Sequence, residues 1–124
     1  MKTQSQVIAA LVLAASSLAA PAGAETGAGL IIVKVSGDRG WTMSCVFERE
    51  GKAPIEKSSR GRGRVETLSA RDSTGGSCNY EGPREGAIQI RFTDESDADN
   101  CPFARVGEHC IGAVAAGEKG SFSF

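Results

Sequence analysis

Hydrophobic and polar residues alternate along two stretches of the chain, and this is the pattern of half-buried β-strands. In residues 41–48 every second position, beginning with Trp41, is apolar, and residues 87–92 alternate in the same way. The short, β-branched stretch 30–36 predicts another strand. Turn-forming residues 37–40 separate it from residues 41–48, so we expect these two strands to form a hairpin.

Weaker patterns predict three further strands, at residues 64–70, 77–80 and 121–124. Residues 72–76 have turn chemistry, residues 110–116 fit either a strand or a short helix, and residues 49–63 fit either a long loop or a ragged sheet edge. Sustained helical periodicity is absent after residue 24. Six or seven short strands with Gly- and Pro-rich turns predict an all-β fold, a small antiparallel β-sandwich of the Ig-like type.

The N-terminal stretch determines which residues we expect in the mature, folded protein. Lys2 precedes an apolar run, and Ala22-Gly23-Ala24 provides a small-residue cleavage site. These are the parts of a secretory signal peptide. We therefore expect residues 1–24 to be removed, residues 25–124 to form one domain, and the mature protein to be secreted or periplasmic. Its later segments are not apolar enough to span a membrane.

Four cysteines lie in the predicted mature chain, at Cys45, Cys78, Cys101 and Cys110. An even number in a small exported domain predicts structural disulfides, and three pairings are possible. We favour Cys45–Cys78 and Cys101–Cys110, because the second pair would close a short loop. A disulfide-stabilised fold suits a domain of this size, whose hydrophobic core is modest.

One family resemblance rests on two runs of residues, 33–52 (VKVSGDRG followed by MSCVFEREGK) and 75–92 (GGSCNYEG followed by AIQIRF). Their order of strand, Gly-Asp turn, strand, loop and Cys-bearing strand resembles the small exported β-sandwich domains of the MmpS type. The resemblance implies the sandwich fold. In that family the domain is an accessory of a membrane transporter and is held by a membrane anchor.

A basic tract stands out against the overall charge. Without Lys2, 13 of the 14 basic residues remain against 15 acidic ones, a formal charge of −2. The tract contains Lys57, Arg60, Arg62 and Arg64. Export, the acidic balance and the lack of an aromatic residue in the tract argue against nucleic acid as its ligand.

We expect the tract to be a flexible inter-strand loop that can bind an unknown protein with an acidic face or an anionic envelope component. Trp41 is a further candidate for partner binding, because Trp is enriched at binding hot spots. Its alternative role is a core residue, because it is in phase with the apolar positions that follow it. The predicted function is thus a non-catalytic binding or accessory domain.

Four carboxylates crowd one loop, at Asp94, Glu95, Asp97 and Asp99. Oxygen ligands at such spacing are weak candidates for a divalent cation, but the positions of an EF-hand glycine and glutamate are not filled. A solvated acidic loop is the preferred interpretation, and we expect no cofactor.

The sequence contains no recognised catalytic motif, so we expect the protein not to be an enzyme. Two alternatives stay open. One is a periplasmic inhibitor of an enzyme such as lysozyme, because residues 73–82 carry Ser, Gly and Tyr in a loosely similar order. The other is a small metal-dependent hydrolase that would use Asp97, Asp99 and His109, the only histidine.

Overall fold

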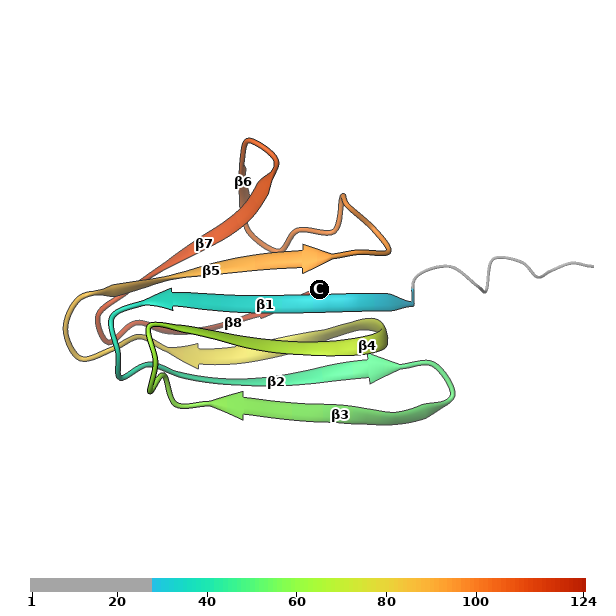
Figure 1. Cartoon of the computed structure of the whole chain (residues 1–124), viewed down its shortest axis with the longest axis horizontal. Helices are drawn as coiled ribbons and strands as arrows, with labels where there is room; N and C mark the ends of the chain where they lie inside the picture. Colours follow the sequence, from blue (N-terminus) through green and yellow to red (C-terminus); the bar gives the residue numbers. More distant parts are fainter. Residues whose placement is uncertain (1–27) are drawn as a thin grey trace, which may run out of the picture.

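The computed structural model describes residues 28–124, and all of its regular structure is β-strand (Figure 1). The predicted signal peptide lies outside these residues. The strands are β1 (Gly29–Gly37), β2 (Thr42–Arg49), β3 (Lys52–Ser59), β4 (Val65–Glu81), β5 (Ala87–Asp94), β6 (Ala104–Val106), β7 (His109–Ala115) and β8 (Lys119–Ser123). All of them pair antiparallel, in the order β3-β2-β4-β1-β5-β7-β6, with β8 also paired to β4.

Strand β4 is long and bent, and its two halves pair with different strands of the sheet. Its first half pairs with β1, whereas residues 73–81 pair with β2 and with β8. The register shifts on both sides near Ser73, and Asp72 adopts a left-handed φ of 57°. Figure 1 shows β4 turning back behind itself at this point. The turn predicted at residues 72–76 is therefore a bend within one strand.

Ser73 stabilises the bend from inside. Its side chain is completely buried, and its hydroxyl lies 3.0 Å from the carbonyl oxygen of Glu48 and 2.9 Å from that of Gly75. A buried hydroxyl without such partners would cost roughly 1–3 kcal/mol. The short polar side chain thus satisfies backbone groups at the bend that the ladder does not pair.

The predicted hairpin of residues 30–36 with residues 41–48 is wrong. Strand β1 pairs with β4 and β5, and β4 separates it from β2. The residues that connect β1 to β2 do not form a tight turn between paired strands. The amides of Gly37 and Gly40 instead donate to the carbonyls of Arg64 and Gly61, which belong to the loop before β4.

Residues 49–63 contain β3, a strand at the edge of the sheet. Of the two predictions for this segment, the ragged sheet edge is therefore confirmed and the long loop is wrong. Of β3 only Ile55 and Ser59 are partly buried, which explains why no clear alternation marks it. Pro54 is tolerated there because an edge strand has a side without ladder hydrogen bonds. Residues 110–116 are also a strand, β7, and the short β6 pairs with it inside the predicted cysteine-closed loop.

The hydrophobic core consists of the alternating residues that predicted the strands. Those of β1, β2 and β5 are at most 3% exposed, namely Ile31, Val33, Val35, Met43, Cys45, Phe47, Ile88, Ile90 and Phe92. The last aromatic residues of the chain complete this core. Phe124 lies 5.0 Å from Phe92 and 5.8 Å from Phe47 between ring centroids, and Phe122 lies 4.6 Å from Phe103.

Both predicted disulfides are confirmed, and no cysteine of the described residues is free. Cys45 and Cys78 are directly opposite each other in β2 and β4, whereas Cys101 joins the loop after β5 to Cys110 of β7. Such bonds form and persist in an oxidising environment outside the cytoplasm.

The predicted class, a small all-β antiparallel fold stabilised by disulfides, is confirmed. The finer prediction of a sandwich of two sheets stays a prediction, because the hydrogen-bonded pairing runs unbroken from β3 to β6. Within residues 28–124 no helix is long and apolar enough to cross a membrane.

Candidate functional site

Three connections gather at one end of the molecule, on the left in Figure 1: residues 37–41, 60–64 and 82–86. Backbone hydrogen bonds tie them together. The amide of Gly37 donates to Arg64 O at 3.0 Å, that of Gly40 to Gly61 O at 3.2 Å, and that of Asp38 to Ala87 O at 3.1 Å. Loops that are far apart in the sequence therefore form one connected surface.

This surface carries exposed arginines from all three connections, and we call it the arginine end: Arg39, Arg60, Arg62, Arg64 and Arg84. Within residues 28–124 the guanidinium groups that donate hydrogen bonds are those of Arg49 and Arg105, which lie elsewhere. The five guanidinium groups of the arginine end are thus available to a partner.

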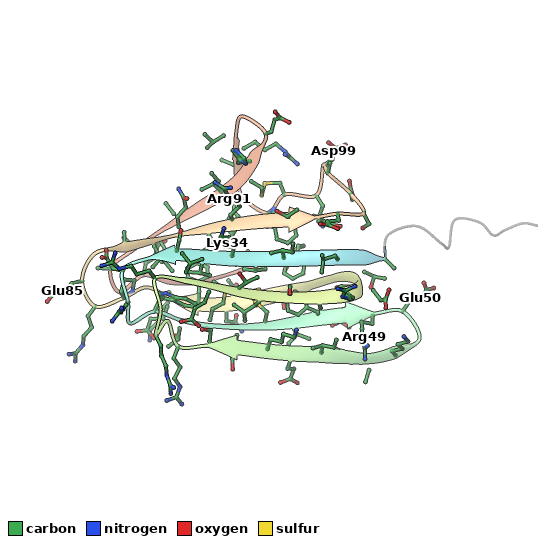
Figure 2. The ribbon with its side chains drawn as sticks, in the orientation of Figure 1. Lys34, Arg49, Glu50, Glu85, Arg91 and Asp99 are labelled. Atoms are coloured by element: carbon green, nitrogen blue, oxygen red, sulfur yellow. A yellow bond between two sulfur atoms is a disulfide. The ribbon has the colours of Figure 1, made fainter. Side chains whose placement is uncertain are left out.

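Several carboxylates near the arginine end are engaged by the chain itself. Asp38 accepts the amide of Ala87 at 3.0 Å, and Glu118 accepts that of Ala115 at 2.9 Å. Glu85 is exposed at the same end, where Figure 2 labels it. The acidic groups of this end therefore mostly support its loops, while the arginines face solvent.

Glu66 holds the loop that presents three of the arginines. Its carboxylate accepts a hydrogen bond from the Ser59 hydroxyl and another, of 2.7 Å, from the amide of Gly63. These bonds, that from Ser59 foremost, and the nearby positive charge of Arg62 lower the pKa of Glu66 below its ordinary value. The carboxylate therefore stays charged where it fixes the loop.

Trp41 lies beneath the same loop and is fully buried. Gly61, with a left-handed φ of 62°, packs on its ring, and a Cβ at this position would lie 2.6 Å from the indole Nε1. The indole N–H finds no hydrogen-bond partner among the described residues. Trp41 thus takes the core role, offers no exposed ring face to a partner, and supports the arginine loop from below.

The structure divides the basic tract. Arg60, Arg62 and Arg64 belong to the connection before β4, whereas Lys57 lies in β3 opposite Cys45. The Lys57 ammonium group donates to the carbonyl oxygen of Ser69. Lys57 is therefore not part of the arginine end but lines a different surface, the groove between β3 and β4.

The acidic loop uses its carboxylates to hold its own conformation. Asp94 accepts the amide of Ser96 at 2.9 Å and the amide group of Asn100 at 2.8 Å, and Asp97 accepts the amide of Asp99 at 3.0 Å. Glu95 is exposed. Among the described residues no three His, Cys, Asp or Glu side chains are placed to hold a metal ion. The arrangement fits the solvated loop.

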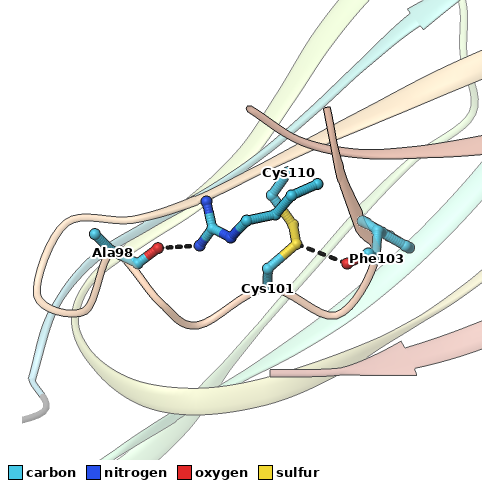
Figure 3. Close-up of a disulfide and its surroundings, with 5 residues drawn as sticks. Ala98, Cys101, Phe103 and Cys110 are labelled. Atoms are coloured by element: carbon cyan, nitrogen blue, oxygen red, sulfur yellow. Dashed lines mark hydrogen bonds between the residues drawn. A yellow bond between two sulfur atoms is a disulfide. The ribbon is translucent and has the colours of Figure 1, made fainter. Parts of the chain in front are cut away.

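A polar pocket of about 430 Å³ lies between this loop and the hairpin of β6 and β7. Figure 3 shows two features beside this pocket: the Cys101–Cys110 disulfide, whose Cys110 lines the pocket, and the hydrogen bond that the Arg105 guanidinium donates to the carbonyl oxygen of Ala98. The oxidised Cys101 Sγ lies 2.9 Å from the carbonyl oxygen of Phe103.

The residues of the hydrolase alternative are only partly brought together. Asp99 and His109 both line the polar pocket, together with the cations Arg91 and Arg105, but Asp97 does not. Cys110, next to His109, is oxidised and cannot serve as a nucleophile. In the stretch considered for enzyme inhibition, Ser73 is buried in the β4 bend and Tyr80 packs against Phe122.

The sequence prediction missed two members of the arginine end, Arg39 and Arg84. Arg39 lies in the turn-forming residues 37–40 (GDRG), and Arg84 lies in residues 82–86 (GPREG) between β4 and β5. Antiparallel strands return alternate connections to the same end of a sheet. The connections 37–41, 60–64 and 82–86 alternate in this way only when β3 and the two halves of β4 are each counted as strands. Because β3 leaves no alternating pattern in the sequence, counting turns along the chain did not group these arginines with the basic tract.

The chain matches no family model, no curated protein and no solved structure. The resemblance to MmpS-type domains therefore stays a prediction.

Proposed function

We propose that this protein is a secreted or periplasmic, non-catalytic binding domain of the cell envelope, and that its arginine end holds an anionic partner. The observation that carries the proposal is the presentation of five exposed arginines on three connections tied by backbone hydrogen bonds. Loops fixed in this way lose little conformational entropy on binding, which favours recognition.

Arginine suits this role better than lysine would. Its planar guanidinium forms paired hydrogen bonds with carboxylate or phosphate groups. An acidic protein face and an anionic envelope polymer both offer such groups. The two partner classes share this chemistry, and the affinity for either should fall as salt screens the charges.

The test uses immobilised poly-L-glutamate as the acidic-protein probe and dextran sulfate as the anionic-polymer probe. Biolayer interferometry would compare the mature protein with Arg60→Gln/Arg62→Gln/Arg84→Gln. We expect the triple variant to bind the preferred probe at least tenfold more weakly and to show a flatter salt dependence. A comparison of the two probes then separates the two partner classes.

The matched control is Lys34→Gln/Lys52→Gln/Arg91→Gln, which removes the same charge from exposed positions outside the arginine end. Figure 2 places Lys34 and Arg91 on β1 and β5, away from the three connections. An equal loss of binding in both variants, or binding that is independent of salt, would contradict the proposal.

A further inference from the structure

Two strand segments leave unpaired edges on either side of one groove. Among the described strands β3 pairs only with β2, and residues 65–70 of β4 pair only with β1. Between these two edges the contacts are made by side chains. The Ser59 hydroxyl donates to Glu66, and the Lys57 ammonium group donates to the carbonyl oxygen of Ser69.

The Ser69 carbonyl shows the direction of the open edge of β4. It accepts its hydrogen bond from Lys57 of β3, so it points away from β1 and into the gap between β3 and β4. A row of such groups is a template for an additional strand. Here a lysine side chain takes the position that a backbone N–H of an added strand would occupy.

The groove along this gap has a volume of about 460 Å³ and is lined by both apolar and charged side chains. Leu30, Ile32 and Ile55 line it and are each partly exposed. These side chains belong to β1 and β3, so they lie on both sides of the open edge. They offer contacts to alternate side chains of an extended segment, which is the usual source of specificity in strand addition.

The charges around the groove favour one kind of occupant. Arg49, Lys57 and Arg71 line it against a single acid, Asp72. The Arg49 guanidinium donates to the carbonyl oxygen of Ala53 at 3.0 and 2.8 Å. Two cations therefore already bind backbone carbonyls here, and the local excess of positive charge complements acidic side chains.

We propose that the groove between β3 and β4 binds an extended acidic peptide segment by strand addition, with acidic and β-branched residues alternating along it. A backbone N–H of the segment replaces Lys57 at the Ser69 carbonyl. The released ammonium group and Arg71 pair with carboxylates of the segment, and its apolar side chains pack on Leu30, Ile32 and Ile55. This site is separate from the arginine end, so either proposal can fail alone.

Fluorescence anisotropy with labelled synthetic peptides tests the proposal on the mature protein. The probe is acetyl-Val-Glu-Val-Glu-Val-Glu-Val-amide. One control replaces Val by Gly, which keeps the charge but removes the strand propensity and the apolar contacts. A second control carries N-methyl groups on alternate backbone nitrogens, which blocks strand addition while keeping the side chains. We expect both controls to bind at least tenfold more weakly than the probe.

The protein variants are Lys57→Glu and the matched Lys34→Glu, which makes the same charge change on exposed β1 outside the groove. Lys57→Glu should weaken probe binding at least tenfold, whereas Lys34→Glu should change it less than twofold. Circular dichroism would verify that both variants fold. If Lys57→Glu does not fold, Lys57→Gln replaces it, with an expected loss of at least threefold.

Three results would overturn the proposal: equal binding of the probe and the Val-to-Gly control, unchanged binding of the N-methylated peptide, or equal effects of the two lysine variants. Sedimentation at rising protein concentration provides a further outcome. A dimer that Lys57→Glu abolishes would show that a second copy of the chain occupies the groove in place of an acidic segment.

Discussion

Gly61 is a residue whose role no sequence pattern indicated. Its left-handed backbone turns the arginine loop, and the missing side chain leaves room for the buried Trp41 ring. Both requirements point to glycine, because an L-residue at positive φ is strained and a Cβ would collide with the indole. The loop can therefore lie directly on the core.

Gly61→Ala should destabilise the protein by about 2 kcal/mol or more, from the left-handed φ together with overpacking against Trp41. Urea unfolding of the mature protein, followed by Trp fluorescence, measures this change. Gly63→Ala is the matched control in the same loop. The nearest atoms to a Cβ there are 3.7 Å away, so we expect a change below about 0.5 kcal/mol. Equal effects of the two substitutions would contradict the packing role of Gly61.

At the scale of elements, the connection between β3 and β4 depends on one carboxylate. The pKa of Glu66 is lowered in the folded protein by the Ser59 hydroxyl and the Gly63 amide. A group with a depressed folded pKa adds stability above its unfolded value, and that stability is lost as the pH falls through the folded pKa. The loop should consequently loosen in acid.

Glu66→Gln should lower the melting temperature near about pH 7, and this difference from wild type should shrink as the pH falls below the ordinary value of 4.5 towards the lowered pKa. Differential scanning calorimetry from about pH 7 to pH 3 checks the trend. Glu85→Gln, on the neighbouring exposed turn, should leave the profile unchanged. A constant difference between wild type and Glu66→Gln at all pH values would refute the assignment.

The strands with one buried face could be predicted, and the others could not. Clean alternation identified β2 and β5, because every second side chain enters the core. Strand β3 buries almost nothing and β6 is fully exposed, so neither leaves a period-two pattern. Pairing is not encoded locally either. The β1–β2 hairpin prediction failed because the partner of β1 is supplied by the bent β4, far along the sequence.

The arginine end, too, could be predicted only in part from the sequence. Arg60, Arg62 and Arg64 could be found as a charge run, but Arg39 and Arg84 join them only through the folding of three distant turns. The burial of Trp41 followed from its phase, whereas the contact with Gly61 is tertiary. Local composition therefore predicted the members of single loops, and topology determined which loops meet.

At the scale of the whole molecule, the two disulfides constrain different lengths of chain. Cys45–Cys78 spans 33 residues and lies in the buried sheet, whereas Cys101–Cys110 spans 9 and holds a surface loop. Replacement of the first pair by Ala should cost about 4 kcal/mol and of the second about 2.5–3 kcal/mol, from loop-closure entropy. Denaturant unfolding of both double variants measures these losses of unfolding free energy. A larger loss for the Cys101–Cys110 pair than for the Cys45–Cys78 pair would contradict the prediction.

The final strand β8 has a consequence for how the protein is made. Phe122 and Phe124 complete the aromatic core, and Phe124 exchanges two backbone hydrogen bonds of 2.9 Å with Gly76. Until the ribosome has added these residues, Phe47 of β2 and Phe92 of β5 lack their contacts with Phe124. Pairing between such distant segments is slow to form. We therefore expect the core to be completed only after the last residues have been synthesised, and such a delay suits the proposed export of a chain that has not yet folded.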